Sequence, residues 1–173
     1  MQIRTINNKD YENVDKLIRE VFTNTSRGYG NEAELVDKIR RSESYINDLE
    51  IVAVENVEII GHGLLSEVRV INSDNSYVGL VLAPLEVAIN HQNKGTGKIL
   101  MKELERRARN LNYQFISILG HSDYYPKFGY IPASKFNIKA PFDVPDEVFM
   151  IRPLFEGALD TVDGIVKYSN AFE

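Results

Sequence analysis

The fold of this chain is decided at residues 85–98, whose sequence is LEVAINHQNKGTGK. The first half alternates in the way that a strand does, and the second half is a polar loop. Gly95 and Gly97 let the backbone of this loop approach a ligand closely and point successive N–H groups at one place. A helix is predicted to begin at Lys98, and its first N–H groups have no partner inside the helix. The stretch therefore predicts a strand, an anion-binding loop and a helix, in that order.

The start of that helix also favours a bound anion. Its first turn contains Lys98 and no acidic residue, and the first carboxylate is that of Glu103. A cation at a helix start opposes the helix dipole at a cost of roughly 0.3–1 kcal/mol, unless an anion lies between them. The alternative is an ordinary glycine-containing loop before an amphipathic helix.

Two other phosphate-binding motifs are excluded at this junction. A Walker A loop needs Gly at position 92 and Ser or Thr at position 99, and the chain has Gln92 and Ile99 there. A dinucleotide fingerprint in this register needs Gly or Ala at position 100, which is occupied by Leu100. A nucleotide-binding regulatory domain is therefore disfavoured.

The elements predicted around this junction follow the order β-α-α-β-β-β-α-β. Helix 98–111 is the clearest, and strand 115–119 is wholly apolar, as expected of a strand buried on both faces. The other predicted elements are strand 3–6, a helix capped by Asn8 or Asp10 that ends near residue 22, helix 31–41, and strands 51–54, 59–70 and 77–89. This order indicates an α/β fold with a mixed sheet. We expect the acidic residues 140–173 to be irregular.

Composition and charge restrict the class of protein. At 173 residues the chain is expected to form one domain, residues 1–173, on which residues 140–173 pack as a C-terminal extension. It has no cysteine, no signal peptide and no apolar run near the ~20 residues that span a membrane, so we expect a cytoplasmic protein without membrane contact. The net charge of -5 argues against nucleic acid as a partner. Residues 94–109 carry a local charge of +4, which fits either a small polyanion or a solvated helix face.

Two motifs in the chain resemble those of the GNAT (GCN5-related N-acetyltransferase) superfamily. The first is Gln/Arg-x-x-Gly-x-Gly/Ala after a central strand, which Gln92, Gly95 and Gly97 match. The second is a tyrosine four residues before Gly-Phe/Tyr, which Tyr125 and the pair at 129–130 match. One amphipathic helix and one buried strand separate the motifs, as in the family. Motifs and element order cover residues 1–132, and the sequences at 119–130 and 141–150 are similar to the YhbS-like subgroup of predicted N-acetyltransferases.

This resemblance implies the GNAT fold, an α/β (α+β) architecture in which helices flank a mixed central β-sheet that is splayed at its central strands. It also implies an N-acetyltransferase that uses acetyl-CoA, with the diphosphate on backbone N–H groups of the loop and the pantetheine along the preceding strand. Pro84 lacks an N–H and fits weakened pairing inside that strand, although a proline at a strand edge or start is the alternative. The implied acetyl-CoA-binding residues are Leu85, Val87, Ile89, Gln92, Asn93, Lys94, Gly95, Thr96, Gly97 and Lys98.

The resemblance also implies the chemistry, in which an acceptor amine attacks the thioester directly in a ternary complex. The departing thiolate benefits from a proton, and Tyr125 stands at the family's position for that acid. A buried core aromatic is the alternative for Tyr125, and we interpret its neighbour Tyr124 in that way. Glu86 is the candidate general base, although many relatives carry a small apolar residue there. If Leu85 and Val87 face one side of the strand, Glu86 faces the other, toward either the acceptor cleft or solvent.

The three histidines are scattered and show no metal-ligand spacing, so no metal is predicted. His62, in the middle of a predicted strand, is interpreted as structural, and His91 as part of the loop. His121, at the end of the buried strand, either orients an acceptor or is an ordinary turn histidine.

The expected acceptor is a small-molecule amine or a protein amino group, and residues 140–173 either help to attract a cationic amine or only keep the protein dissolved. An acyltransferase with a longer acyl donor is one alternative. A non-catalytic sensor or regulatory module that binds CoA or acyl-CoA is another, although the presence of Tyr125 counts against it. Members of the family often pair, so a homodimer is the oligomer to test.

Overall fold

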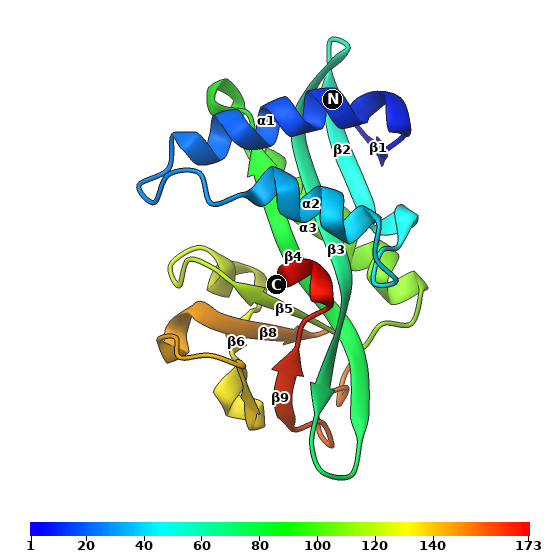
Figure 1. The fold of residues 1–173 in the computed structure, drawn as a ribbon, viewed down its shortest axis with the longest axis vertical. Helices are drawn as coiled ribbons and strands as arrows, with labels where there is room; N and C mark the ends of the chain where they lie inside the picture. The colour runs from blue at the N-terminus through cyan, green and yellow to red at the C-terminus, as the bar shows by residue number, and fades with distance from the viewer.

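The computed structural model describes residues 1–173 as one mixed β-sheet with helices on both faces (Figure 1). The main path of the sheet runs in the order β1-β2-β3-β4-β5-β8-β6, and β9 pairs with both β3 and β7. Neighbouring strands are antiparallel except for β4 with β5 and β7 with β9. The strands are β1 (Gln2–Thr5), β2 (Glu50–Glu55), β3 (Glu58–Ile71), β4 (Ser76–Val87), β5 (Phe115–Leu119), β6 (Ile131–Pro132), β7 (Ile138–Lys139), β8 (Phe149–Pro153) and β9 (Gly164–Lys167).

Three α-helices cover the sheet, two on one face and one on the other (Figure 1). They are α1 (Tyr11–Thr23), α2 (Glu32–Arg40) and α3 (Thr96–Asn110). Each buries residues at helical spacing, which in α3 are Leu100, Met101, Leu104 and Ala108. Single 3-10 turns lie at Asn8–Asp10, Asn47–Leu49, Ile89–His91, Tyr125–Phe128, Ala133–Phe136, Asp146–Val148 and Asn170–Phe172. No helix is both long and apolar enough to cross a membrane.

The predicted fold class is confirmed, with small differences at element ends. The predicted cap of α1 is the clearest difference, because Asn7 caps the preceding 3-10 turn and Asp10 makes no capping bond to α1. The carboxylate of Asp10 instead accepts hydrogen bonds from Arg4, at 2.7 and 3.0 Å. Strand β4 ends at Val87, before the predicted residue 89, because residues 89–91 form a 3-10 turn.

The sheet opens between its two central parallel strands. Strands β4 and β5 pair only at Leu80 with Ile116 and at Val81 with Ser117, whereas β4 continues to Val87. The register between β3 and β4 shifts at the same level, which leaves an extra residue in β4 around Pro84. The main-chain edge of β4 beyond Val81 is therefore not covered by β5.

Residues 140–173 supply β8 and β9, so the prediction of an irregular segment is wrong over these two strands. Strand β8 lies between β5 and β6, and β9 pairs with β3 at residues 69–71. The acidic residues that suggested irregularity lie in the turns between the strands, whereas Phe149, Met150 and Ile151 of β8 are buried.

Candidate active site

The loop before α3 presents unpaired backbone N–H groups. Asn93 and Gly95 adopt left-handed conformations, with φ of 62° and 89°, and the helix begins at Thr96. No side chain caps the helix, and the N–H groups of residues 95–98 donate to no acceptor in the protein. Lys94 and Lys98 are exposed beside them. This arrangement can bind a phosphate group through main-chain hydrogen bonds and the positive end of the helix dipole.

Gln92, the first residue of the motif, fastens the loop to the strand. Its side-chain amide donates to the main-chain oxygen of Val87 at 2.9 Å. In the structure, the side chain of Gln92 therefore stabilises the conformation of the loop.

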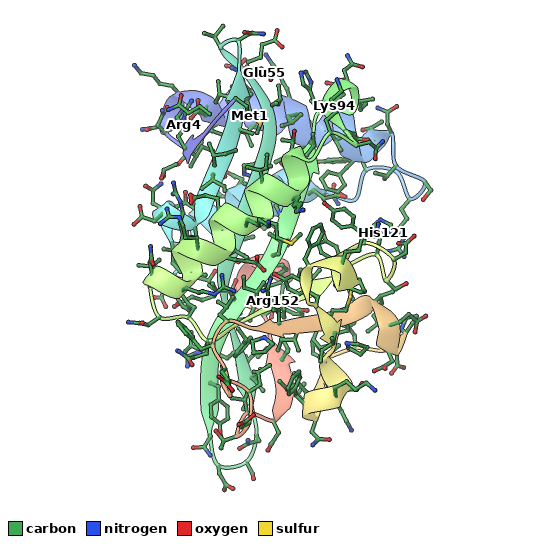
Figure 2. All side chains as sticks on the ribbon, turned by 180° about the vertical axis from the view of Figure 1, so that it is seen from behind. Met1, Arg4, Glu55, Lys94, His121 and Arg152 are labelled. Atoms are coloured by element: carbon green, nitrogen blue, oxygen red, sulfur yellow. The ribbon has the colours of Figure 1, made fainter.

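Gly97 lies against a tyrosine hydroxyl from a distant part of the chain. A Cβ atom at position 97 would lie 3.0 Å from the hydroxyl oxygen of Tyr124 and 3.8 Å from Cγ2 of Val87. Tyr124 is half-buried and packs against the main core, so its interpretation as a buried core aromatic holds only in part. Sequence reasoning missed its position beside the loop, because the only signal was its adjacency to Tyr125. Figure 2 shows Lys94, which is part of the loop, and His121, which shortly precedes the two tyrosines in the sequence, on the same side of the molecule.

Three apolar residues before the loop were predicted to bind the cofactor along one strand, but they do not all lie on one face of β4. Leu85 and Val87 are half-buried on the α3 side of β4, where Leu85 packs beside Gly63 and Val87 beside Gly97. Ile89 lies beyond the end of β4, is 41% exposed, and lines a surface cleft with residues of α1.

Tyr125 begins the 3-10 turn that follows β5. Its ring makes edge-to-face contacts with Tyr124 and Tyr130, with centroids 5.0 and 6.0 Å apart. The ring lies where a side chain on Gly120 would be, because a Cβ atom there would come within 2.5 Å of it. Burial raises the pKa of Tyr125 above its usual value, and the nearby charge of Glu86 adds to this. The hydroxyl therefore stays protonated at neutral pH.

Glu86 is one end of a buried chain of charged groups that crosses three strands. Its Oε1 contacts Nδ1 of His62 on β3, and Nε2 of His62 lies 2.8 Å from Oε1 of Glu50 on β2. Arg40, at the end of α2, donates to the same oxygen of Glu50 at 2.6 Å, and Tyr45 donates to its Oε2 at 2.7 Å. Glu86 is 3% exposed, so the alternative in which it points to solvent is wrong.

Burial and neighbouring charges shift the pKa values of His62, Glu50 and Glu86 in different directions. Burial alone would lower the pKa of His62, but the negative charges of Glu86 and Glu50 outweigh it and raise the pKa to about 9. Burial would raise the pKa of Glu50, but hydrogen bonds from His62 and Arg40 lower it to about 2. The pKa of Glu86 is raised by burial, which His62 offsets only in part. The second oxygen of Glu86, Oε2, is buried and has no hydrogen-bond partner in the protein.

The other histidines lie outside this chain of charges. His91 is in the 3-10 turn before the loop and lies 3.2 Å from Glu55. His121 is exposed, and its main-chain oxygen accepts hydrogen bonds from the N–H groups of Tyr124 and Tyr125. No group of three or more His, Asp or Glu residues is arranged to hold a metal ion.

The opened sheet and the unpaired N–H groups before α3 agree with what a comparison with known protein families finds. The family model described as "Acetyltransferase (GNAT) family" matches residues 12–130. The chain therefore belongs to the GNAT family of N-acetyltransferases, as its motifs predict.

Two N-acetyltransferases of Escherichia coli are similar to this chain in sequence. The chain is 32% identical to the uncharacterized N-acetyltransferase YjhQ of Escherichia coli K12 over 131 residues, which cover 75% of this chain and 72% of YjhQ. It is 28% identical to the uncharacterized N-acetyltransferase YhbS of the same strain over 164 residues, which cover 94% of this chain and 93% of YhbS.

Solved structures agree with these relatives. The crystal structure of E. coli YhbS in complex with CoA has a TM-score of 0.88 and 25% identity, and the match covers 99% of this chain and 91% of that one. A GNAT acetyltransferase of Brucella melitensis in complex with acetyl-CoA shares the fold, with a TM-score of 0.80, 23% identity, and coverage of 99% of this chain and 97% of that one.

Proposed function

We propose that this protein transfers an acetyl group from acetyl-CoA to an amine by direct attack in a ternary complex. The observation that carries the proposal is the set of unpaired N–H groups at residues 95–98, which follow the end of β4, the strand that β5 leaves unpaired beyond Val81. The relatives with CoA or acetyl-CoA bound support it, because their structures match nearly the whole chain. The acceptor is a small-molecule amine or a protein amino group.

In this proposal, residues 93–98 bind the diphosphate of acetyl-CoA through their N–H groups, assisted by Lys94 and Lys98. The pantetheine, which carries amide groups, lies along the edge of β4 that β5 leaves open, near Leu85 and Val87. Ile89, beyond the strand, would contact the cofactor only near the loop. The thioester then lies between β4 and the tyrosines that follow β5.

Two side chains then handle the protons of the reaction. Tyr125 has a protonated hydroxyl with no hydrogen-bond partner in the protein, so it can donate to the departing thiolate. Glu86 has a free buried oxygen and a raised pKa, and both properties suit a base that accepts a proton from the attacking amine.

A glycine substitution tests the cofactor site. Gly97→Asp should abolish CoA binding, because it puts a side chain and a negative charge where phosphate belongs. Isothermal titration calorimetry with CoA and acetyl-CoA measures this. Gly97→Ala is the matched control for size, and its contact with Tyr124 at 3.0 Å can be relieved by adding Tyr124→Phe. CoA affinity that survives Gly97→Asp would place the cofactor elsewhere.

A screen for release of free CoA from acetyl-CoA with diverse amines and peptides then identifies the acceptor. Tight CoA binding without turnover on any acceptor, with Tyr125 intact, would favour a binding module over an enzyme.

A further inference from the structure

A β-sheet does not need buried charged groups such as His62 and Glu50, which connect to Glu86 through hydrogen bonds. An ion pair or imidazole buried between strands costs more to desolvate than an apolar residue of the same size, unless its geometry is excellent. Here His62 is 0% exposed and Glu50 is 0% exposed, and they occupy adjacent central strands. Every side-chain nitrogen and oxygen of Glu50, His62 and Glu86 is paired except one, Oε2 of Glu86. That exception is the atom proposed to accept the proton.

We propose that His62 and Glu50 are positioning residues for acetyl transfer, which hold Glu86 as a carboxylate and leave its free oxygen to the acceptor amine. This inference rests on the proposed role of Glu86 and extends it to residues that do not touch either substrate. Its geometric basis is that β3 and β4 place His62 directly opposite Glu86, and β2 and β3 place Glu50 one strand further away.

The order of the charges explains how the group works. Glu86 lies in an apolar, buried environment that favours its neutral form, and a neutral carboxyl cannot accept a proton from an amine. An imidazolium at His62 opposes this by donating a hydrogen bond to Oε1. Glu50 stabilises that imidazolium on its other nitrogen, and Arg40 with Tyr45 keeps Glu50 ionised and in place.

The surroundings of Glu86 contain no other strong source of charge. The ionisable and charged groups that act on it or on its partners lie on six different segments of the chain, and they are His62, Glu50, Arg40, Tyr45, Tyr11 and Tyr125. Arg40 lies over the ring of Tyr11, 3.9 Å from its centroid, which fixes the outer end of the chain of charges against α1.

The first test reads His62 directly and needs no acceptor. The chain has three histidines, so ¹⁵N imidazole NMR of the purified protein resolves them, and His62→Gln assigns one set of signals. We expect both ring nitrogens of His62 to carry a proton at pH 7 and Glu50→Gln to shift its titration to lower pH. Glu105→Gln is the matched control, because Glu105 is also a buried, arginine-paired carboxylate but lies on α3. A neutral His62 at pH 7 in the wild-type protein would overturn the proposal.

The second test reads the base through the pH profile of kcat/KM. Loss of the imidazolium should raise the pKa of Glu86, so His62→Gln should move the acidic limb upward by about one pH unit or more. With the same acceptor in all assays, such a shift cannot come from the amine. A variant that only perturbed packing would lower activity equally at every pH. His91→Gln, which removes a surface histidine paired with Glu55, should leave the limb in place.

Glu86→Gln separates the two proposals. If Glu86→Gln abolishes the acidic limb of the kcat/KM profile and His62→Gln leaves this limb in place, Glu86 is the base and the positioning role of His62 and Glu50 is wrong. If Glu86→Gln keeps both activity and limb, the proposed base is wrong, whereas the NMR titration still decides the state of His62. A limb that moves in His62→Gln and is absent in Glu86→Gln supports both.

Discussion

At the scale of single residues, the hydroxyl of Tyr125 is poised to remain a proton donor. Its ring is enclosed by Tyr124, Tyr130 and the backbone at Gly120, and its pKa is raised by that burial. A phenol with a raised pKa does not ionise near neutral pH, but it can give its proton to a thiolate formed beside it.

Removal of this hydroxyl should therefore affect turnover and spare binding. We expect Tyr125→Phe to lower kcat by ~10²-fold or more, the usual scale for a lost general acid. Steady-state kinetics and calorimetry with CoA measure the two effects. Tyr113→Phe is the control, because it loses a partly buried hydroxyl bonded to Glu67 outside the site. Unchanged turnover in Tyr125→Phe would mean that another group protonates the thiolate.

The two candidate catalytic residues could be named from the sequence, but the partners of Glu86 could not. Tyr125 was identifiable because its distance from Gly129 is a local pattern. The contact of Glu86 with His62 depends on how two long strands align, and a bulge near Pro84 shifts that alignment. Strand register is set by packing and turns across the whole hairpin, so spacing along the chain does not reveal it.

At the scale of elements, β4 and β5 are held together over a very short stretch. Two residue pairs join them, and directly beside these pairs Gly79 faces the ring of Phe115, which is 0% exposed. A Cβ atom at position 79 would lie 2.2 Å from that ring. This contact lies just below the point where the strands separate.

Overpacking at this contact should loosen the sheet. Gly79→Ala should destabilise the protein by roughly 1–3 kcal/mol, the usual cost of overpacking a core. Chemical denaturation measures this, and Phe115→Leu combined with Gly79→Ala should recover part of the loss because it vacates the space. If the double variant is as unstable as the sum of the single ones, the ring contact is not the cause.

Long helices and strands were predictable, whereas the short C-terminal strands were not. Helix α3 repeats its apolar residues over several turns, which gives a strong periodic signal. Strands β8 and β9 have five and four residues and are separated by acidic turns, so no periodicity develops. Their positions depend on β5 and β3, which are distant in the sequence.

At the scale of the whole molecule, the buried charges tie stability to pH. The pKa of His62 is raised from 6.5 to about 9, so its contribution to stability is complete below pH 6.5 and is lost as the pH rises through 9. The pKa of Glu50 is lowered from 4.5 to about 2, so its contribution is complete above pH 4.5 and is lost as the pH falls toward 2. The raised pKa of Glu86 acts in the same direction as that of His62.

The free energy of unfolding should therefore fall between pH 6.5 and 9.5, by up to ~3 kcal/mol from His62. His62→Gln should show a flatter profile over this range, and His91→Gln should follow the wild type. Urea denaturation at several pH values measures the profiles. Equal slopes for His62→Gln and the wild type would show that the imidazole is not the group that titrates.

The late strands also have a consequence for how the chain is made. Strand β3 gains β9 as a neighbour only at residues 164–167, and β5 gains β8 only at residues 149–153. During synthesis on the ribosome, therefore, one edge of β5 and one edge of β3 stay unpaired until these residues have been translated. Exposed edges of this kind invite association with other nascent chains. The nascent chain is therefore most exposed to such association until β8 and β9 have been translated.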